Sequence, residues 1–376
     1  MENVLITGGA GFIGSKLTLS LIEKGHKVTV LDNLSPQIHG EDVNLSPLYN
    51  SIKDKVNFIH GDVRNLSDWK KAIVNQHIVV HLAAETGTGE SMYDIYNYTN
   101  TNVSATALML DVLTNSKHKV KKILLASSRA VYGEGMYKCK EQGVVFPSCR
   151  KNKDLKVGVY DFMSQSSNSK LIPIPTNEES HILPTSVYAI NKLNQEQLIL
   201  LVAKNLNINT TVLRFQNVFG PGQSLSNPYT GILSIFSTII LNNNNIDVYE
   251  DGLQSRDFIY IDDVVEASYL ALTDNDSGEV FNVGTGIQIS VLDVAEKLKS
   301  LFNSDINIEI SGKFRAGDIR HNFADISKIK NHLGFCPKVS FDEGLAKFVS
   351  WVKTQEIYDD KYLESIKKLE GKGLIK

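Results

Sequence analysis

Short runs of aliphatic residues alternate with helix-like segments through the first half of the chain. The runs have the length and β-branched content of buried strands, and they cover 4–6, 27–31, 56–60, 78–84, 121–126 and 210–215. Segment 15–24 repeats its apolar positions at helical spacing, and 97–113 and 186–202 also have helical character. Strands that alternate with helices predict an α/β protein whose parallel sheet is covered on both faces.

From residue 219 onward the predicted elements are spaced more widely, as in a second, smaller lobe. We predict a first domain over 1–218, to whose sheet the segment 255–285 returns, and a lobe with a charged helical tail over 219–376. Residues 134–180 are rich in Lys, Ser, Asn and Pro and have little periodicity. This segment is predicted to be an insertion in the first domain.

A glycine-rich turn separates the first strand from the first helix. Gly8 permits the tight turn, Gly11 lets the backbone approach a pyrophosphate, and Gly14 lets the helix pack closely on the strand. The phosphates would then lie at the helix N-terminus beside Phe12 and Ile13, where free N–H groups and the helix dipole favour anions. A purely structural glycine turn is the alternative, but the position between two strands favours a dinucleotide.

Asp32 ends the second strand, about twenty residues after the turn begins. Its carboxylate is placed to accept both ribose hydroxyls of adenosine and would repel a 2′-phosphate, and no arginine follows closely. We therefore predict NAD rather than NADP, bound by a Rossmann-type doubly wound parallel sheet. Asp62 would bond adenine; its alternative role is a helix N-cap, which Ser67 fits better. Further cofactor contacts are expected from Asn33, Val63, Leu82, Ala83, Ala84 and Asn102.

Composition narrows the function classes. The net charge of −3 over 376 residues gives no electrostatic case for binding nucleic acid or an anionic membrane. No apolar run is long enough to span a bilayer, and a strand at the very start leaves no room for a signal peptide. Cys139, Cys149 and Cys336 form no even set for disulfides. We expect a cytoplasmic enzyme or binding protein.

Tyr188 and Lys192 are spaced i, i+4, so they share one face of a helix. A tyrosine with a pKa near 10 is a poor base, but a nearby ammonium and a positively charged nicotinamide would stabilise its phenolate. Ser128 ends a predicted parallel strand and could bond the same reacting oxygen. Such a Tyr–Lys pair is usually a solvated helix face; combined with the glycine turn and Ser128, it favours catalysis.

These motifs resemble those of the extended short-chain dehydrogenase/reductases, in particular the NAD-dependent sugar epimerases and dehydratases. The resemblance also includes Gly61-Asp62, the segments 81–84 and 214–222, Arg256-Asp257-Phe258 and Arg315-Ala316-Gly317-Asp318, and so covers almost the whole chain. It implies that residues 219–376 are mainly a substrate-binding lobe.

The resemblance also implies a role for each matching residue. Tyr188 would be the acid/base, Lys192 would bind the nicotinamide ribose and tune Tyr188, and Ser128 would orient the sugar hydroxyl. Arg256 and Arg315 would bind the pyrophosphate and nucleotide, with Asp318 on the nucleotide ribose; the alternative is a surface ion pair, for instance between Arg256 and Asp257. The substrate contacts implied are Thr86, Ser128, Asn217, Asn227, Arg256, Arg315 and Asp318.

Sugar 4,6-dehydratases carry an Asp-Glu pair directly after the active-site Ser/Thr. This chain has Arg129 and Ala130 there, and neither transfers a proton at neutral pH. We therefore expect a nucleotide-sugar 4-epimerase that oxidises C4 transiently and re-reduces it on the other face. An NAD(P)H-dependent 4-keto-sugar reductase and a cofactor-sensing regulator are the alternatives; Asp32 disfavours NADPH, and the intact Ser128, Tyr188 and Lys192 disfavour a sensor.

Finer resemblance, in 84–92, in 225–231 and around Tyr137-Lys138-Cys139, is to the dTDP-L-rhamnose 4-epimerase group, with UDP-hexose 4-epimerases as the alternative. Relatives with this insertion carry a further Cys-x-x-Cys that would complete a zinc site, and 162–167 has none. We therefore predict no metal and an insertion that is a loop over or beside the active site. The family also suggests a homodimer through the helices that begin near Asn97 and Ser186.

Overall fold

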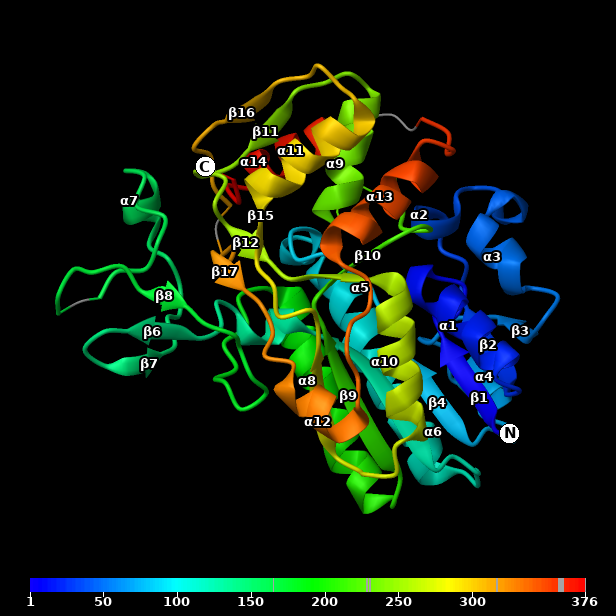
Figure 1. Cartoon of the computed structure of the whole chain (residues 1–376). Helices are drawn as coiled ribbons and strands as arrows, with labels where there is room; N and C mark the ends of the chain where they lie inside the picture. The colour runs from blue at the N-terminus through cyan, green and yellow to red at the C-terminus, as the bar shows by residue number, and fades with distance from the viewer. Residues whose placement is uncertain (165, 228, 230, 316, 358–361, 376) are drawn as a thin grey trace.

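The computed structural model describes residues 1–376 except 165, 228, 230, 316, 358–361 and 376. A seven-stranded, wholly parallel sheet forms its centre (Figure 1), in the order β14-β9-β5-β4-β1-β2-β3. The strands are β1 (Asn3–Thr7), β2 (Lys27–Asp32), β3 (Asn57–His60), β4 (Ile78–His81), β5 (Lys122–Ser128), β9 (Asn209–Phe215) and β14 (Glu279–Val283). The chain reverses its direction across the sheet between β1 and β4. Open α/β sheets bind their ligands at such a switch point.

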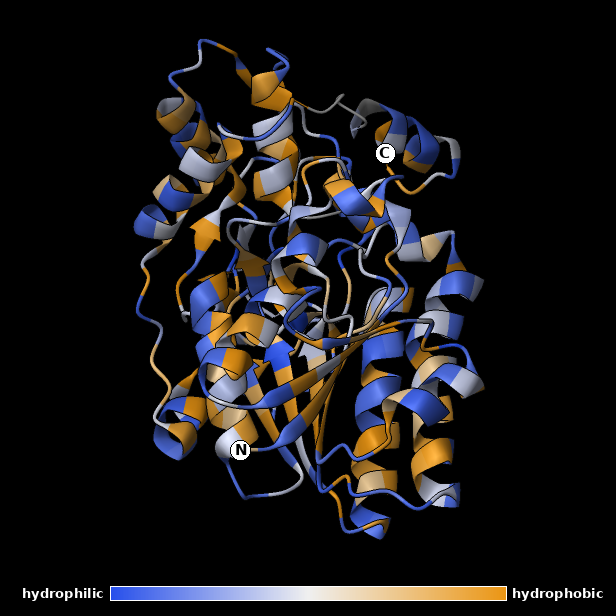
Figure 2. Cartoon of the chain, turned by 90° about the vertical axis from the view of Figure 1, so that its right-hand side faces the viewer, coloured by the Kyte–Doolittle hydropathy of each residue, from blue (hydrophilic) through white to orange (hydrophobic). Residues whose placement is uncertain are grey.

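Helices cover both faces of this sheet. Successive strand residues point to opposite faces, so Val4 and Ile6 of β1 pack in one buried cluster and Leu5 in another. The first cluster lies beneath α1 (Phe12–Glu23), α10 (Ile261–Thr273) and α12 (Ser327–Leu333). The second lies beneath α4 (Leu66–Ala72), α6 (Ala105–Asn115) and α8 (Val187–Asn205). Figure 2 shows the hydrophobic strands between these helices, so the predicted fold class is confirmed.

The second lobe stands above the carboxyl edge of the sheet (Figure 1). Its own apolar cluster is formed by α9 (Ile232–Leu241), α11 (Val291–Phe302) and α13 (Phe341–Val352), with Phe236, Leu298 and Phe348 buried among them. Its short strands are β10 (Asn217–Phe219), β11 (Ile246–Val248), β12 (Ser255–Arg256), β13 (Phe258–Tyr260), β15 (Ile289–Ser290), β16 (Ile308–Ile310) and β17 (His321–Asn322). Within 255–285, β14 joins the large sheet, whereas β12 and β13 pair elsewhere. The division near residue 218 stays a prediction.

The insertion is more ordered than its sequence predicts. β6 (Tyr137–Cys139) pairs antiparallel with β7 (Gly143–Val145) and β8 (Ile172–Pro173) around a small apolar cluster that includes Tyr137 and Leu171. The prediction of a loop was therefore wrong, because strands this short give no readable alternation. The insertion, which also carries α7 (Asn152–Leu155), projects from one side of the molecule (Figure 1). Its Arg150 donates to the carbonyl of Asp318 at 2.8 Å.

The remaining short helices are α2 (Pro36–His39), α3 (Pro47–Ile52), α5 (Ile95–Thr99) and α14 (Tyr362–Gly371), with 3₁₀ turns at Val43–Leu45, Glu90–Met92 and Arg129–Tyr132. The predicted helix over 97–113 is α5 and α6 joined by a π-helical segment, Asn100–Ser104. In the part of the chain that the structure describes, no helix is both long and apolar enough to cross a membrane.

Candidate functional site

The glycine turn leaves β1 at the switch point. Gly8 has φ +69°, and a Cβ there would lie 2.8 Å from the backbone nitrogen of Ala83, which follows β4. A Cβ on Gly14 would lie 2.2 Å from the carbonyl oxygen of Gly8, so α1 packs directly on the turn. No capping side chain bonds the N-terminus of α1, whose N-cap is Gly11. The first-turn N–H groups, including those of Phe12 and Ile13, have no intrahelical acceptor, as a pyrophosphate cradle requires.

Asp32 is fixed against this turn. Its carboxylate accepts hydrogen bonds from the backbone nitrogens of Ala10 and Leu34, both at 2.9 Å. Each carboxylate oxygen has a second lone pair, so the group is positioned and still able to accept ribose hydroxyls. The glycine turn and Asp32 together fit a dinucleotide without a 2′-phosphate.

The predicted adenine side of the site lies after β3. The Asp62 carboxylate is held by the guanidinium of Arg64 at 2.6 Å and by the Asn33 amide at 3.3 Å. Asp62 does not cap the following helix, and neither does Ser67: the N-cap of α4 is Asn65. Val63 is buried, and its carbonyl accepts from the indole of Trp69.

Leu82, Ala83 and Ala84 follow β4 at the same edge, and Ala83 N–H donates to the Thr7 hydroxyl. Asn102 is fully buried, and its amide bonds the backbone N–H and carbonyl of Glu85 at 2.9 and 3.0 Å. Asn102 therefore anchors the loop that follows β4. Its direct contact with a cofactor stays a prediction.

The structure brings the three predicted catalytic residues to one place. Ser128 ends β5, and Tyr188 lies in the first turn of α8, near enough for the Ser128 hydroxyl to influence the pKa of the tyrosine. Burial raises the pKa of Tyr188, while the Ser128 hydroxyl and the positive charge of Arg129 act to lower it. The Ser91 hydroxyl accepts from the backbone nitrogen of Tyr188 at 3.1 Å and so ties the loop after β4 to this helix.

Lys192 lies one turn further along α8. Its ammonium donates to the carbonyl of Ala126 at 3.0 Å and stands 5.9 Å from the centre of the Tyr188 ring. Burial lowers the pKa of Lys192 to about 8, against the opposing effect of Glu196. The ammonium is thus anchored to β5 beside the tyrosine.

Arg129 is a site residue that sequence reasoning had only used to argue against dehydration. Its Nε donates to the Asn217 side-chain oxygen at 3.0 Å, and the residue lines a cleft between the two lobes. Burial and the neighbouring Arg256 lower the pKa of the Arg129 guanidinium to about 9, so it remains charged at neutral pH. The sequence feature that could have identified Arg129 as a site residue is its position directly after Ser128, the last residue of β5.

The space between the residues that line the cleft measures about 670 Å³, a volume that includes open solvent. The loop after β4 contributes Thr88, Gly89 and Met92 to its wall. The predicted Thr86 is an exposed residue of the same loop, and its carbonyl accepts from the Tyr98 hydroxyl at 2.6 Å. Asn227 is buried, and its side chain accepts from the backbone of Tyr229 at 2.9 Å. Thr86 and Asn227 are not among the residues found to line this cleft.

The second lobe supplies a cluster of charges. Arg315 and Asp318 line the cleft, and the Asp318 side chain is 41% exposed. Arg256 is buried and bonds Asp318 at 3.0 Å, while its other contacts are the carbonyls of Ser255, Ile319 and Arg320. The alternative pairing of Arg256 with Asp257 was wrong, because the Asp257 carboxylate accepts hydrogen bonds from Thr285, Gly286 and Ala324.

A model of the NAD dependent epimerase/dehydratase family matches residues 4–284. The chain belongs to this family. It is 34% identical over 354 residues to dTDP-L-rhamnose 4-epimerase of Burkholderia thailandensis, a match that covers 93% of this chain and 95% of that protein.

Two solved structures are similar over almost the whole chain. One is UDP-glucose 4-epimerase of Thermotoga maritima with UDP-glucose, at TM-score 0.75 and 29% identity, covering 93% of this chain and 98% of that one. The other is UDP-glucuronic acid 4-epimerase of Bacillus cereus with UDP-glucuronic acid and NAD. Its TM-score is 0.74 at 26% identity, and the match covers 93% of this chain and 99% of that one. The protein is thus an NAD-dependent enzyme of the nucleotide-sugar epimerase/dehydratase family.

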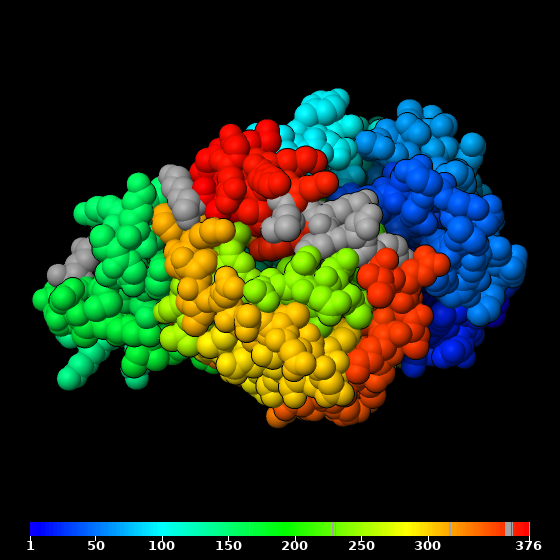
Figure 3. Space-filling view, turned by 90° about the horizontal axis from the view of Figure 1, so that it is seen from above, coloured from blue at the N-terminus to red at the C-terminus, as the bar shows by residue number. Residues whose placement is uncertain are grey.

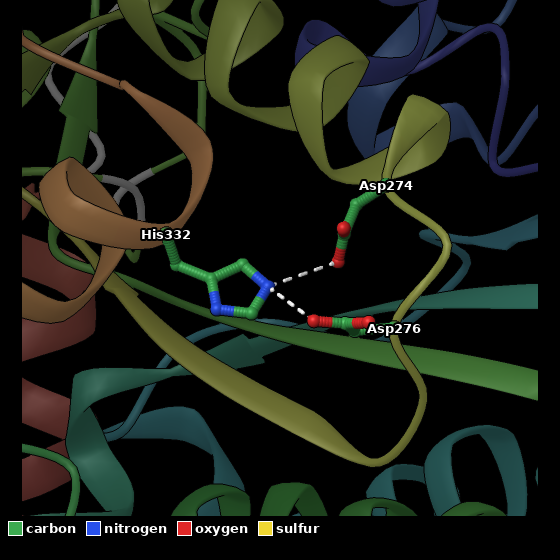
Figure 4. Close-up of side chains that lie close together, drawn as sticks. All are labelled: Asp274, Asp276 and His332. Carbon is green, nitrogen blue, oxygen red and sulfur yellow. Dashed lines mark ion pairs between the residues drawn. The ribbon is translucent and has the colours of Figure 1, made fainter.

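The absence of a metal stays a prediction, and neither cysteine of the insertion is among the residues that line the cleft. Cys139 is buried and donates its thiol to Glu141, and Cys149 is exposed. Among the described residues, one group has the composition of a metal site: Asp274, Asp276 and His332 (Figure 4). It lies near the amino edge of β5, since the Asp274 carbonyl accepts from Lys122 at the start of that strand. There His332 pairs with the two carboxylates at 3.5 and 3.0 Å and ties α12 to the end of α10.

Proposed function

We propose that this enzyme is a nucleotide-sugar 4-epimerase. The observation that carries the proposal is that Ser128, at the end of β5, and Tyr188, in the first turn of α8, lie beside a cleft in which Arg129 and Ala130 follow the serine. In this pair Tyr188 is the one group that can transfer a proton, which is sufficient for oxidation and reduction at a single carbon of the sugar. Elimination of water would require a further acid and base, and Arg129 cannot act as either at neutral pH.

The reaction follows from these groups. Tyr188 accepts the proton of the C4 hydroxyl, which Ser128 holds in place, and returns a proton after the 4-keto sugar has turned. NAD, which the glycine turn and Asp32 would hold, would supply the hydride chemistry by taking up the C4 hydride and giving it back on the opposite face. Burial raises the pKa of Tyr188; the Ser128 hydroxyl and the Arg129 charge oppose that rise, so both favour the basic form. No external reductant is consumed.

We further propose that the substrate is of the dTDP-L-rhamnose type, interconverted with dTDP-6-deoxy-L-talose. The support is the 34% identity to the Burkholderia enzyme along nearly the full chain. A UDP-hexose is the second candidate substrate. Among UDP-hexoses, one observation favours a sugar that carries a carboxylate. The Arg129 guanidinium faces the cleft and could pair with a carboxylate at C6.

A substrate panel tests the proposal. Purified protein without added cofactor is incubated with dTDP-L-rhamnose, UDP-glucose, UDP-galactose, their N-acetyl forms and UDP-glucuronic acid, and each tube is followed by proton NMR. A C4 epimer in one tube fixes the reaction and the sugar. If nothing changes until NADH is added with a 4-keto sugar, the protein is a reductase. NAD binding without any turnover indicates a cofactor sensor.

We also propose a homodimer that works in the cytoplasm in carbohydrate biosynthesis. The helices beginning near Asn97 and Ser186 pack together as α5, α6 and α8. Ile190 and Leu201 are 46% and 64% exposed and lie on one face of α8, three turns apart. Tyr96, near the start of α5, is 81% exposed. A monomeric mass by light scattering at micromolar concentration would exclude the dimer.

A further inference from the structure

The last described helix, α14, is amphipathic. Ser365, Ile366 and Leu369 are buried, whereas Lys367 and Lys368 are exposed. The buried positions recur at helical spacing, so one side of α14 rests on the body of the protein. In Figure 3 this C-terminal segment, in red, covers part of the upper face, next to the cyan stretch of the chain that follows β4.

The surface beneath α14 combines both lobes. Ile366, Leu369 and Ile375 form a cluster with Tyr93, from the loop region after β4, and Tyr249, from the second lobe. The Lys372 ammonium stands 5.1 Å from the centre of the Tyr93 ring. The C-terminal segment therefore joins the two walls between which the cleft lies.

Two of its side chains belong to the cleft itself. Leu369 and Leu374 line the same space as Arg129 and Arg315. Leu369 also packs against the loop after β4, because a Cβ on Gly89 would lie 3.9 Å from its Cδ1. The cleft thus has a charged side from Arg129, Arg315 and Asp318, and an apolar side supplied partly by the C-terminus.

The same segment holds Arg315. One terminal nitrogen of the guanidinium donates to the Tyr362 hydroxyl at 3.3 Å, and the backbones of Arg315 and Ile375 form an antiparallel bridge. The guanidinium carbon lies 5.4 Å from the centre of the Tyr249 ring. The Arg315 Nε is buried without a hydrogen-bond partner among the described residues. A buried donor of this kind calls for an acceptor, which a ligand or an ordered water supplies.

We propose that the C-terminal segment contributes three residues to the substrate site: Leu369 and Leu374 form its apolar wall, and Tyr362 positions Arg315 toward the anionic part of the ligand. This inference rests on the proposed function, since the ligand is taken to be a nucleoside-diphosphate sugar. A diphosphate would meet Arg315, and the wall would exclude water from the sugar. The segment is then needed for substrate affinity but not for holding NAD, whose glycine turn and Asp32 lie on β1 and β2.

The experiment compares Leu369→Ala, Leu374→Ala and Tyr362→Phe with a matched control, Lys368→Ala, on the exposed side of α14. Titration calorimetry with dTDP-L-rhamnose and UDP-glucose measures affinity in the full chain, and NAD content is measured on the same samples. We expect about tenfold weaker binding for each leucine variant and about fivefold weaker binding for Tyr362→Phe. NAD content and the control variant should match the unaltered protein.

Measurements of turnover distinguish a role of Tyr362 in positioning Arg315 from a role in folding. Tyr362→Phe should raise KM and leave kcat unchanged, because Arg315 would bind the substrate equally in the ground and transition states. If the unaltered protein binds a nucleotide sugar and Leu369→Ala and Tyr362→Phe bind it equally well, the role of the C-terminal segment is refuted and the epimerase proposal stands. If the unaltered protein neither binds nor converts any nucleotide sugar, both proposals fall. Should Leu369→Ala fail to fold, Tyr362→Phe still decides.

Discussion

Replacing Gly14 by alanine tests how the cofactor site is built. The added Cβ would lie 2.2 Å from Gly8 O, 2.7 Å from Gly9 Cα and 3.0 Å from Gly8 C. All three are backbone atoms, so no side chain can rotate away, and α1 must move by about 0.8 Å to reach even a 3.0 Å contact. Overpacking of this kind costs about 1–3 kcal/mol.

The same movement displaces the N–H groups at the start of α1. A misplacement near 1 Å weakens a precisely oriented interaction by about 100-fold, or ~2.7 kcal/mol. We therefore expect Gly14→Ala to lose both stability and NAD. NAD content is measured after heat release from the purified protein. Stability is measured by urea unfolding of NAD-free samples, because bound NAD itself stabilises the folded state.

Gly11→Ala is the matched comparison. Its Cβ would meet only Gly8 O, at 3.3 Å, and Gly11 has an ordinary φ of −72°. The fold should lose less than about 1 kcal/mol, as expected for alanine at an N-cap, while NAD binding falls because the methyl group occupies the approach of the pyrophosphate. Gly14→Ala with normal stability would refute the packing argument. Gly11→Ala with normal NAD content would refute the phosphate position.

Three further outcomes follow from the site. Tyr188→Phe should abolish turnover while NAD stays bound; a near-normal rate would remove Tyr188 as the base. Asp32→Ala should weaken NAD about tenfold, and unchanged affinity by calorimetry would contradict the ribose contact. Burial lowers the pKa of His81 to about 3, so the unfolded chain binds a proton below pH 6.5 that the folded chain does not. Stability is therefore lost as pH falls, by about 2 kcal/mol between pH 7 and 5; His81→Gln should remove this loss in urea titrations, and an unchanged slope would contradict it.

The sequence predicts the sheet well because its signals are local. The runs 27–31, 121–126 and 210–215 contain most of β2, β5 and β9, since buried parallel strands are nearly continuous aliphatic segments. The run 78–84 is longer than β4, which ends at His81. Its last three residues leave the sheet because they pass over Gly8, whose missing side chain makes room for Ala83.

Some residues of the candidate site could be predicted from the sequence and others could not. Ser128 ends β5 and Tyr188 lies in the first turn of α8, and the fold fixes both positions at the same edge of the sheet, so the family motifs were sufficient to predict that they lie near each other. Leu369 and Leu374 reach the cleft from the far end of the chain. The amphipathic pattern of 362–371 shows that this helix packs on something, but periodicity carries no information about which surface receives it.

The pairing of Arg256 shows most directly which contacts cannot be predicted from the sequence. Asp257 is its neighbour in sequence, yet successive residues of an extended chain point in opposite directions. Arg256 therefore faces Asp318, while Asp257 turns to the backbone of Gly286 and Ala324. The distant carboxylate arrives because β12 pairs in parallel with β17, which sets Arg256 beside Asn322, shortly after Asp318 in the chain. Such a contact is decided by the register of two short strands far apart in the sequence, so it becomes visible only when the second lobe is assembled.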